Sequence, residues 1–123
     1  MLRKVLHSKI HMARVTGASV DYMGSITVDS ELLDAAGLRA SDAVSVANAR
    51  SGARFETYIF RGERGSRTIE VNGAAALLVE RGDPLILMHF AWMSDEEYRA
   101  FRPTVLLMNA DNSVRQITHY EPG

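Results

Sequence analysis

Apolar and polar residues alternate along much of this chain with the two-residue period of a β-strand. The clearest example covers residues 8–15, where Ile10 and Met12 fall on one side and Lys9 and His11 on the other. This pattern and the turn residues between segments predict further strands at residues 25–28, 43–49, 55–61, 68–71, 84–92, 104–108 and 113–118. Most of the chain is therefore expected to be β-structure.

Two of these segments carry additional information. Residues 43–49 and 55–61 are expected to pair as a hairpin, because Ser51-Gly52 between them is typical of a turn. Residues 84–92 are strongly apolar, which predicts a buried strand.

Two short helices are expected between the strands. Residues 30–37 have a helical pattern that ends at Gly37, a residue favoured at helix C-termini. A second helix is expected to begin at Ser94, which forms a capping box with Glu97, and to end before Pro103. Many short strands with few helices favour a small β-barrel, because closure removes exposed sheet edges.

Composition narrows the class of protein. The chain has 123 residues, of which 46% are hydrophobic, enough for one domain with a buried core. Its 14 Lys and Arg against 15 Asp and Glu leave a formal charge of -1, so neither a nucleic-acid nor a membrane partner is expected. It has no cysteine, which excludes disulfides and thiolate metal sites. Without an apolar signal core or a spanning segment, a cytoplasmic protein is expected.

The dipeptide Gly24-Ser25 can carry chemistry of its own. If the backbone is strained, the serine hydroxyl can attack the preceding carbonyl, and glycine tolerates backbone angles closed to other residues. The amide becomes an ester, and β-elimination breaks the chain. The resulting dehydroalanine loses ammonia and becomes a pyruvoyl group. Gly-Ser is also a common dipeptide, and most instances are turns.

Polar residues in two other predicted strands also suggest a site. Lys9 and His11 share one face of their strand, either as site residues or as a solvated edge. Arg54 and Tyr58 share one face of another, with Thr57 on the opposite face. Arginine binds carboxylates through paired hydrogen bonds, and tyrosine can deliver a proton. The alternative is a surface arginine and a core tyrosine.

A run of small residues follows Asn72, comprising Gly73, Ala74, Ala75 and Ala76. Small side chains allow backbone amides to approach a ligand closely. The same run also fits a tight turn into a short helix.

In order and spacing these segments resemble the pyruvoyl-dependent aspartate 1-decarboxylases of pantothenate biosynthesis, over nearly the whole chain. The residues that carry the resemblance are Lys9-Ile10-His11, Tyr22-x-Gly24-Ser25, Leu33-Asp34-Ala35-Ala36-Gly37, Arg54-x-x-Thr57-Tyr58, Gly62-x-x-Gly65-Ser66, Asn72-Gly73-Ala74-Ala75-Ala76, Asp95-Glu96-Glu97 and Arg102-Pro103.

The resemblance implies a mainly β protein, a small double-psi β-barrel with two or three short helices. It implies a homotetramer with active sites between subunits. It also implies self-cleavage between Gly24 and Ser25, into a small chain of residues 1–24 and a larger chain of residues 25–123 that begins with the pyruvoyl group. Some members need a maturation factor, and the sequence does not decide whether this one does.

The implied reaction converts L-aspartate into β-alanine and CO2 through a Schiff base on the pyruvoyl carbonyl, with no metal. Ser25 and Tyr58 are the implied catalytic residues, with Tyr58 as proton donor. Thr57 is implied in maturation with Gly24 and Ser25, its hydroxyl stabilising the oxyanion. The implied substrate-binding residues are Lys9, His11, Arg54, Thr57, Asn72, Gly73, Ala74 and Ala75.

Two alternatives stay open. Ala47 stands where family members often carry a larger side chain near the pocket, so another amino acid is a second candidate substrate. Small barrels also serve as binding or assembly modules, in which case Ser25 would stay unprocessed and Tyr58 would be a packing residue. The spacing of His7 and His11 would suggest a metal only on a helix, and here the segment is predicted to be a strand. His89 is expected to be structural and His119 exposed.

Overall fold

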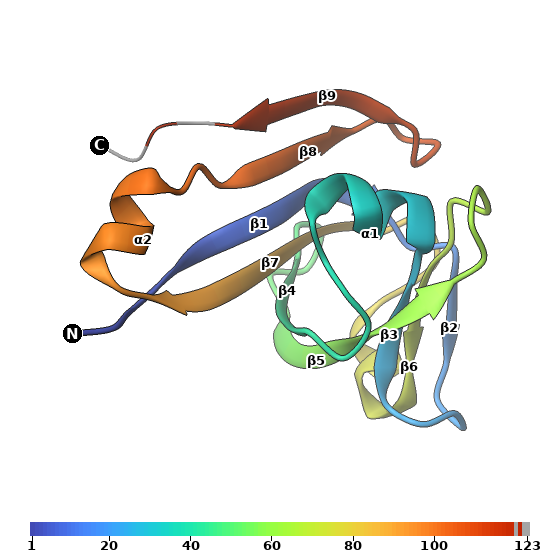
Figure 1. Cartoon of the computed structure of the whole chain (residues 1–123). Coiled ribbons are helices and arrows are strands. Elements are labelled where there is room, and N and C mark those ends of the chain that lie inside the picture. The colour runs from blue at the N-terminus through green and yellow to red at the C-terminus, as the bar shows by residue number, and fades with distance from the viewer. Residues whose placement is uncertain (120, 122–123) are drawn as a thin grey trace.

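The computed structural model describes residues 1–119 and 121 (Figure 1). Within these residues the chain forms nine strands, two α-helices and one 3-10 helix. These elements are β1 (Arg3–Arg14), β2 (Gly17–Ser19), β3 (Ser25–Asp29), α1 (Ser30–Ala36), β4 (Ala43–Asn48), β5 (Arg54–Gly62), β6 (Ile69–Asn72), η1 (Gly73–Leu78), β7 (Pro84–Met93), α2 (Asp95–Ala100), β8 (Thr104–Met108) and β9 (Val114–His119).

β1 and β2 form one interrupted strand, separated by Val15 and Thr16. The Val15 N–H donates to the Asp83 carbonyl at 3.0 Å, and the Thr16 N–H donates to the Ile69 carbonyl at 2.8 Å. β1 pairs antiparallel with β7, and β2 pairs parallel with β6. The chain therefore passes from one neighbouring strand to another without leaving the sheet.

This continuity closes the sheet into a barrel. β6 pairs with β3, β3 with β5, β5 with β4, β4 with β7, and β7 with β1. The interrupted strand β1–β2 completes the circle, because β2 returns to β6. Two pairs are parallel, β2–β6 and β3–β5, and the other pairs of this closed set are antiparallel. The expected fold, a mainly β double-psi barrel with short helices, is confirmed.

The core lies inside the barrel and consists of alternate residues of its strands. On β5, Ile59 is fully buried, whereas its neighbours Tyr58 and Phe60 are exposed. The same two-residue period on the other strands contributes aliphatic side chains, each worth about 1.5–3 kcal/mol when fully buried. The bulkiest fully buried side chains of the strands are Ile10, Ile26, Ile59, Ile69, Leu85, Leu87 and Leu106, and Leu33 of α1 packs in the same core.

The expectation that residues 84–92 form a buried strand holds for the first half of β7, but within the single chain it does not hold for the second half, residues 88–92, which the sequence leaves open as core or subunit interface. Leu85 and Leu87 are buried inside the barrel, but Trp92 is 65% exposed. The reason is that β7 continues past β4, where it pairs only with the start of β1. There the apolar residues on its outer face are uncovered in the single chain.

Both predicted helices are present with the expected ends. α1 is capped at its start by Asp29, which accepts from the Glu31 N–H, and at its end by Gly37 at a φ of 77°. That left-handed conformation favours glycine. α2 has the full capping box, with reciprocal hydrogen bonds between Ser94 and Glu97.

The sequence pattern missed β2 and the first five residues of β1. Gly17-Ala18-Ser19 has no apolar alternation, and β2 is positioned instead by hydrogen bonds next to it. The Thr16 hydroxyl donates to the Ile69 carbonyl at 3.1 Å and accepts from the Ile69 N–H at 2.9 Å. The strands β8 and β9 were both predicted, and they pair as a hairpin that extends the sheet outside the barrel by parallel pairing of β8 with β1 (Figure 1).

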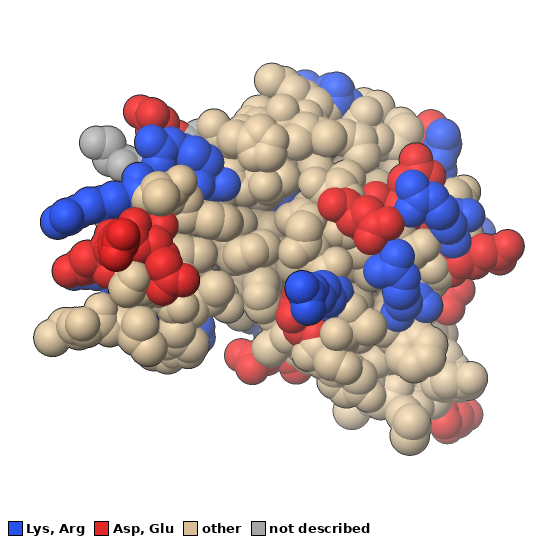
Figure 2. All heavy atoms as spheres, in the orientation of Figure 1, with Lys and Arg blue, Asp and Glu red and all other residues tan. Residues whose placement is uncertain are grey.

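The surface carries both signs of charge. Figure 2 shows Lys and Arg interspersed with Asp and Glu on one face, with wide uncharged areas between them. Over residues 1–119 and 121, the structure contains no helix with the length and apolar character needed to cross a membrane.

One buried carboxylate, directly before β7, joins the end of β4 to the turns that follow β4 and η1. Asp83, 4% exposed, accepts from Arg50 at 2.5 and 3.0 Å, from Asn48 Nδ2 at 2.8 Å and from the Glu80 N–H at 2.8 Å. The hydrogen bond from Arg50 is the largest influence on the pKa of Asp83 and outweighs burial, so that pKa lies well below its usual value. Because the folded state favours the charged form, this carboxylate stabilises the fold above the unfolded pKa.

We expect Asp83→Asn to lower the free energy of unfolding by about 2 kcal/mol at pH 7, because charged hydrogen bonds to a buried group are lost. The loss should shrink as the pH falls below about 4, where the unfolded carboxyl is protonated, and should vanish near the folded pKa. Urea unfolding of the parent protein and of Asp83→Asn, from pH 7 down to the folded pKa, measures this difference in the free energy of unfolding. Asp34→Asn is the matched control, because Asp34 is half exposed and its arginine pairs contribute under about 1 kcal/mol. A pH-independent loss for Asp83→Asn would contradict the assignment.

Candidate active site

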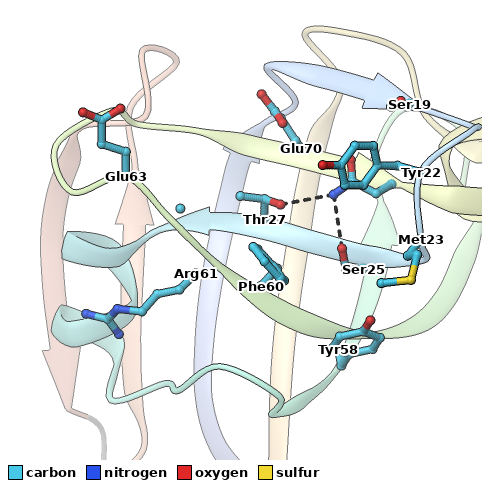
Figure 3. Close-up of a pocket in the computed structure, with 12 residues that line it drawn as sticks. Ser19, Tyr22, Met23, Ser25, Thr27, Tyr58, Phe60, Arg61, Glu63 and Glu70 are labelled. Atoms are coloured by element: carbon cyan, nitrogen blue, oxygen red, sulfur yellow. Dashed lines mark hydrogen bonds between the residues drawn. The ribbon is translucent and has the colours of Figure 1, made fainter.

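A cavity of about 500 Å³ opens at the start of β3 (Figure 3). Its walls come from β3, β5, β6 and the segment that leads into β3. The lining residues are Ser19, Tyr22, Met23, Ser25, Thr27, Tyr58, Phe60, Arg61, Gly62, Glu63, Glu70 and Asn72.

Ser25 is the first residue of β3 and is only 5% exposed. It lies opposite Asn72, the last residue of β6, in the antiparallel pair of these strands. The Asn72 side-chain amide donates to Ser25 Oγ and to Thr27 Oγ1, each at 3.1 Å (Figure 3). One amide therefore holds two hydroxyls that lie on the same face of β3.

Gly73 approaches Gly24 closely. A Cβ on Gly73 would lie 2.6 Å from Gly24 Cα and 2.8 Å from Gly24 N, distances that no real side chain tolerates. Gly73 also has a φ of 80°, in the left-handed region. In contrast, Gly24 has a φ outside that region, and a Cβ there would meet nothing within 4 Å. The prediction that Gly24 supplies the special backbone conformation is therefore wrong, because that glycine is Gly73.

Aromatic and apolar side chains surround Ser25. Tyr58 projects from the outer face of β5 toward Ser25 and Met23, and Tyr22 lies on the other side of the opening (Figure 3). The parallel pairing of β3 with β5 aligns Ile26 with Ile59, which places Ser25 and Tyr58 at neighbouring positions. Tyr22, Met23, Tyr58 and Phe60 are all exposed in the single chain.

The charged residues of the cavity leave it slightly negative. The lining contains two glutamates, Glu63 and Glu70, and one arginine, Arg61, whose guanidinium donates to Asp34 Oδ1 outside the cavity at 3.2 Å. Counting one charge each gives a net charge of -1 for the lining. The cavity by itself is therefore poorly suited to a doubly charged carboxylic acid.

Three predicted site residues lie elsewhere in the single chain. Arg54 is four residues from Tyr58 along β5, about 13 Å at the usual rise, and lines a separate cavity of about 210 Å³ with Ala47 and Met88. Lys9 and His11 lie on the outer side of β1, with Ser8 and Ile10 facing the core, as the alternation predicted.

His11 lies in an unusual environment. Its Nδ1 is buried and has no hydrogen-bond partner among the residues that the structure describes. Burial is the largest cause that lowers the pKa of His11, and the charges of Lys9 and Arg115 lower it further. His11 is therefore expected to be neutral at pH 7 in the single chain.

The remaining predicted residues are not at the cavity either. Thr57 lies on the opposite face of β5 from Tyr58, as predicted, and does not line the cavity around Ser25. Ala74 and Ala75 are on η1, where Ala74 is exposed and Ala75 packs against the core. The single chain therefore brings together Gly24, Ser25, Tyr58, Asn72 and Gly73.

Several lining residues were absent from the predicted site. Thr27 and Glu70 follow from the two-residue period, since they share strand faces with Ser25 and Asn72. That signal required the pairing of β3 with β6, which one sequence does not contain. Phe60 and Glu63 depend in the same way on the parallel pairing of β5.

The histidines outside this cavity have packing contacts. The His7 ring stacks on Phe101 at 5.1 Å and meets His89 edge-on at 5.2 Å. His89 Nδ1 lies 2.7 Å from the Ala43 carbonyl oxygen. His119 is exposed, as predicted. In the described part of the chain, no three His, Cys, Asp or Glu side chains are grouped to hold a metal ion.

Comparison with known proteins identifies a family whose sequences match this chain. The profile of the family described as "Aspartate decarboxylase" matches residues 1–115. The chain is 48% identical to the aspartate 1-decarboxylase of Neisseria meningitidis over 122 residues, covering 99% of this chain and 96% of the relative. It is 45% identical to the aspartate 1-decarboxylase of Bacillus licheniformis over 123 residues, covering 100% of this chain and 97% of the relative.

Among solved structures, the chain is similar to the rationally designed mkDPBB_sym_86 protein, with a TM-score of 0.47 and 14% identity over 64% of this chain and 91% of that one. The likeness is too weak to support an argument, and the fold described above rests on its strand pairing.

Because Gly73 approaches Gly24 closely, alanine substitutions at these two positions should differ in how much they lower the free energy of unfolding. Gly73→Ala should lower the free energy of unfolding by about 1–2 kcal/mol or more, because alanine is strained at this φ and its Cβ displaces Gly24. Gly24→Ala should change it by less than about 0.5 kcal/mol, because the space is open. Urea unfolding of the two variants decides, and a greater cost at Gly24 would contradict this geometry.

Proposed function

The chain belongs to the aspartate decarboxylase family, and from this premise we propose that it cleaves itself between Gly24 and Ser25 and uses the carbonyl group formed there to decarboxylate L-aspartate. The products are β-alanine and CO2. The observation that carries the proposal is the placement of Ser25. Its hydroxyl is held by Asn72 at the wall of a cavity, and the carbonyl of Gly24 precedes it at the point where Gly73 packs closest.

The cleavage uses atoms of the chain itself and water. Ser25 Oγ adds to the Gly24 carbonyl carbon, the Ser25 nitrogen is released from that carbon, and an ester replaces the amide. Loss of the Ser25 α-proton expels the Gly24 carboxylate, which ends the small chain of residues 1–24. Water then hydrolyses the remaining dehydroalanine, and its nitrogen leaves as ammonia. A pyruvoyl group is left at the start of residues 25–123.

The surroundings of Ser25 fit such a group. The residue is almost buried, yet it lines a cavity of about 500 Å³, large enough for an amino acid. Asn72 Nδ2 donates into this position, and Tyr58 lies beside it. When present, a pyruvoyl group supplies a carbonyl that condenses with a substrate amine and accepts the electrons released with CO2.

The chain's own residues would perform the remaining tasks. Tyr58 is exposed on the cavity side of β5, where its hydroxyl can deliver a proton to the substrate α-carbon. Asn72 keeps a donor directed at the reacting position. Thr57 remains a candidate for stabilising the oxyanion during cleavage, and Gly73, Ala74 and Ala75 for holding substrate oxygens with backbone amides.

Charge supports an active site shared between subunits. The lining around Ser25 has a net charge of -1, whereas aspartate carries two carboxylates. Arg54, Lys9 and His11 lie away from Ser25 in their own chain, so we assign them to the active site of a neighbouring copy. A homotetramer with active sites at its interfaces meets this requirement. The exposed side chains Tyr22, Met23 and Phe60 around the opening supply apolar surface for such contacts.

One observation favours a second substrate. Ala47 lies opposite Arg54 in the pairing of β4 with β5 and lines the same small cavity. A methyl side chain leaves room beside the arginine, so a longer acid such as glutamate, or cysteine sulfinate, is the alternative. Relative rates on the three acids separate these possibilities.

The non-enzymatic alternative has no supporting observation. A cytoplasmic location, and the need for a maturation factor, stay predictions.

Ser25→Ala should abolish cleavage, because no hydroxyl remains to attack Gly24. An intact-mass spectrum under denaturing conditions should show one full-length chain for the variant and two fragments for the parent, split at Gly24-Ser25. The larger fragment should be lighter than its hydrolysed serine form by the mass of one ammonia. Ser19→Ala, at the same cavity, is the control and should cleave normally. Fragments split at this bond in Ser25→Ala would refute the mechanism.

Tyr58→Phe should leave cleavage intact and reduce the rate of decarboxylation by about 10²–10⁴-fold, as expected when a general acid is lost. Tyr22→Phe provides the matched control, because Tyr22 lines the same cavity and should lose much less. The two rates are measured from β-alanine formation by fully cleaved protein. Near-parental turnover by Tyr58→Phe would remove this residue from the donor role.

A further inference from the structure

A second concave site lies between the end of β1, the loop before β6 and the turn before β7. It has a volume of about 470 Å³ and contains three arginines, Arg14, Arg67 and Arg81. It shares no lining residue with the cavity around Ser25, and it contains neither Lys9, His11 nor Arg54. The aspartate reaction therefore gives no account of these arginines.

The net charge of this site is positive, although the net charge of the whole chain is slightly negative. The lining contains three arginines and one carboxylate, that of Asp111, so its net charge is +2. The whole chain has a formal charge of -1. Three like charges from separate segments repel one another, so their gathering in one hollow is a cost that a bound anion would offset.

Much of the donor capacity is unused. Arg67 Nη1 donates to Asp111 at 3.1 Å, but both side chains are more than half exposed, so the pair is weak and exchangeable. Arg14 Nε is buried and has no hydrogen-bond partner within the described residues. Arg14 Nη1 makes one long contact, 3.4 Å, with the Gly82 carbonyl.

The floor of the site is fixed by a buried asparagine. Asn112 is 2% exposed and has a φ of 63°, a conformation that asparagine tolerates. Its side chain accepts from the Arg14 N–H at 2.7 Å and donates to the Arg14 and Arg67 carbonyls at 2.9 and 3.0 Å. The backbones of two arginines from distant parts of the chain are therefore fixed relative to each other.

The third arginine is fixed through its neighbour. The Gly82 N–H donates to the Val15 carbonyl at 2.8 Å, which joins the turn that carries Arg81 to the end of β1. All three arginine-bearing segments are thus connected by hydrogen bonds before any ligand binds. Such preorganisation reduces the entropy lost on binding.

We propose that the pocket formed by Arg14, Arg67 and Arg81 is a binding site for a phosphate group, distinct from the aspartate site. A phosphate monoester carries a charge of about -1.5 to -2 at pH 7 and three acceptor oxygens, which match a lining of net charge +2 with three guanidiniums. A carboxylate has one charge and two oxygens and would leave part of this capacity unused. The volume leaves space for a small organic group attached to the phosphate.

The test measures binding of inorganic phosphate to the full-length protein by calorimetry, at an ionic strength held constant with chloride. We expect saturable binding that the double variant Arg14→Gln/Arg81→Gln weakens by at least about tenfold. The control is Arg39→Gln/Arg99→Gln, which removes the same charge outside this pocket and should have little effect. Arg81→Gln alone should also weaken binding, and Arg81 makes no internal hydrogen bond with a described residue, so its loss leaves the fold intact.

Four results would overturn the proposal. One is the absence of saturable phosphate binding to the parent protein. Another is an equal loss in the two double variants, which would indicate general charge attraction. The third is displacement of phosphate by L-aspartate, which would place the anion at the aspartate site. Equal affinity for succinate and phosphate would also reject the assignment to phosphate and indicate a general dianion site.

Discussion

The passage of β1 into β2 is the constraint on which the rest of this structure depends. At Val15 and Thr16 the chain leaves β7 and joins β6, and the hydrogen bonds of Thr16 with Ile69 fix that junction. Because one interrupted strand contacts both neighbours, the sheet closes and its inner face becomes a sealed core. The junction also fixes where β6 lies, and β6 ends at Asn72, directly before Gly73.

The arrangement at Ser25 follows from that closure. β6 pairs with β3 so that Asn72 lies opposite Ser25, and β5 lies on the other side of β3, which places Tyr58 beside the cavity. The glycine that permits this packing is Gly73, since any side chain there would collide with Gly24. A hydroxyl, its amide donor and an adjacent carbonyl are thus brought together by strand order, although they are up to 47 residues apart in sequence.

The sequence predicted most elements because their signals are local. The two-residue period located the strands, and the capping residues located α1 and α2. It missed β2, whose Gly17-Ala18-Ser19 has no pattern and depends on pairing with β6. It overestimated the burial of β7 within the single chain, because an apolar segment does not reveal whether its own chain or another chain covers it. Glu63 and Glu70 were missed at the cavity because their positions depend on strand register, which no local pattern encodes.

The overall charge of -1 conceals a separation that matters for what each surface can bind. The cavity around Ser25 has a net charge of -1, and the pocket of Arg14, Arg67 and Arg81 has a net charge of +2. Fields of opposite sign in separate hollows act locally, since screening limits their range to about 10 Å. A dicarboxylic substrate in the Ser25 cavity would be stabilised by cations from elsewhere, and in the proposed homotetramer Arg54 and Lys9, on outer strand faces away from the cavity, would supply them to a neighbouring copy. The separation of these cations from Ser25 in the single chain is thus a physical reason for the proposed assembly.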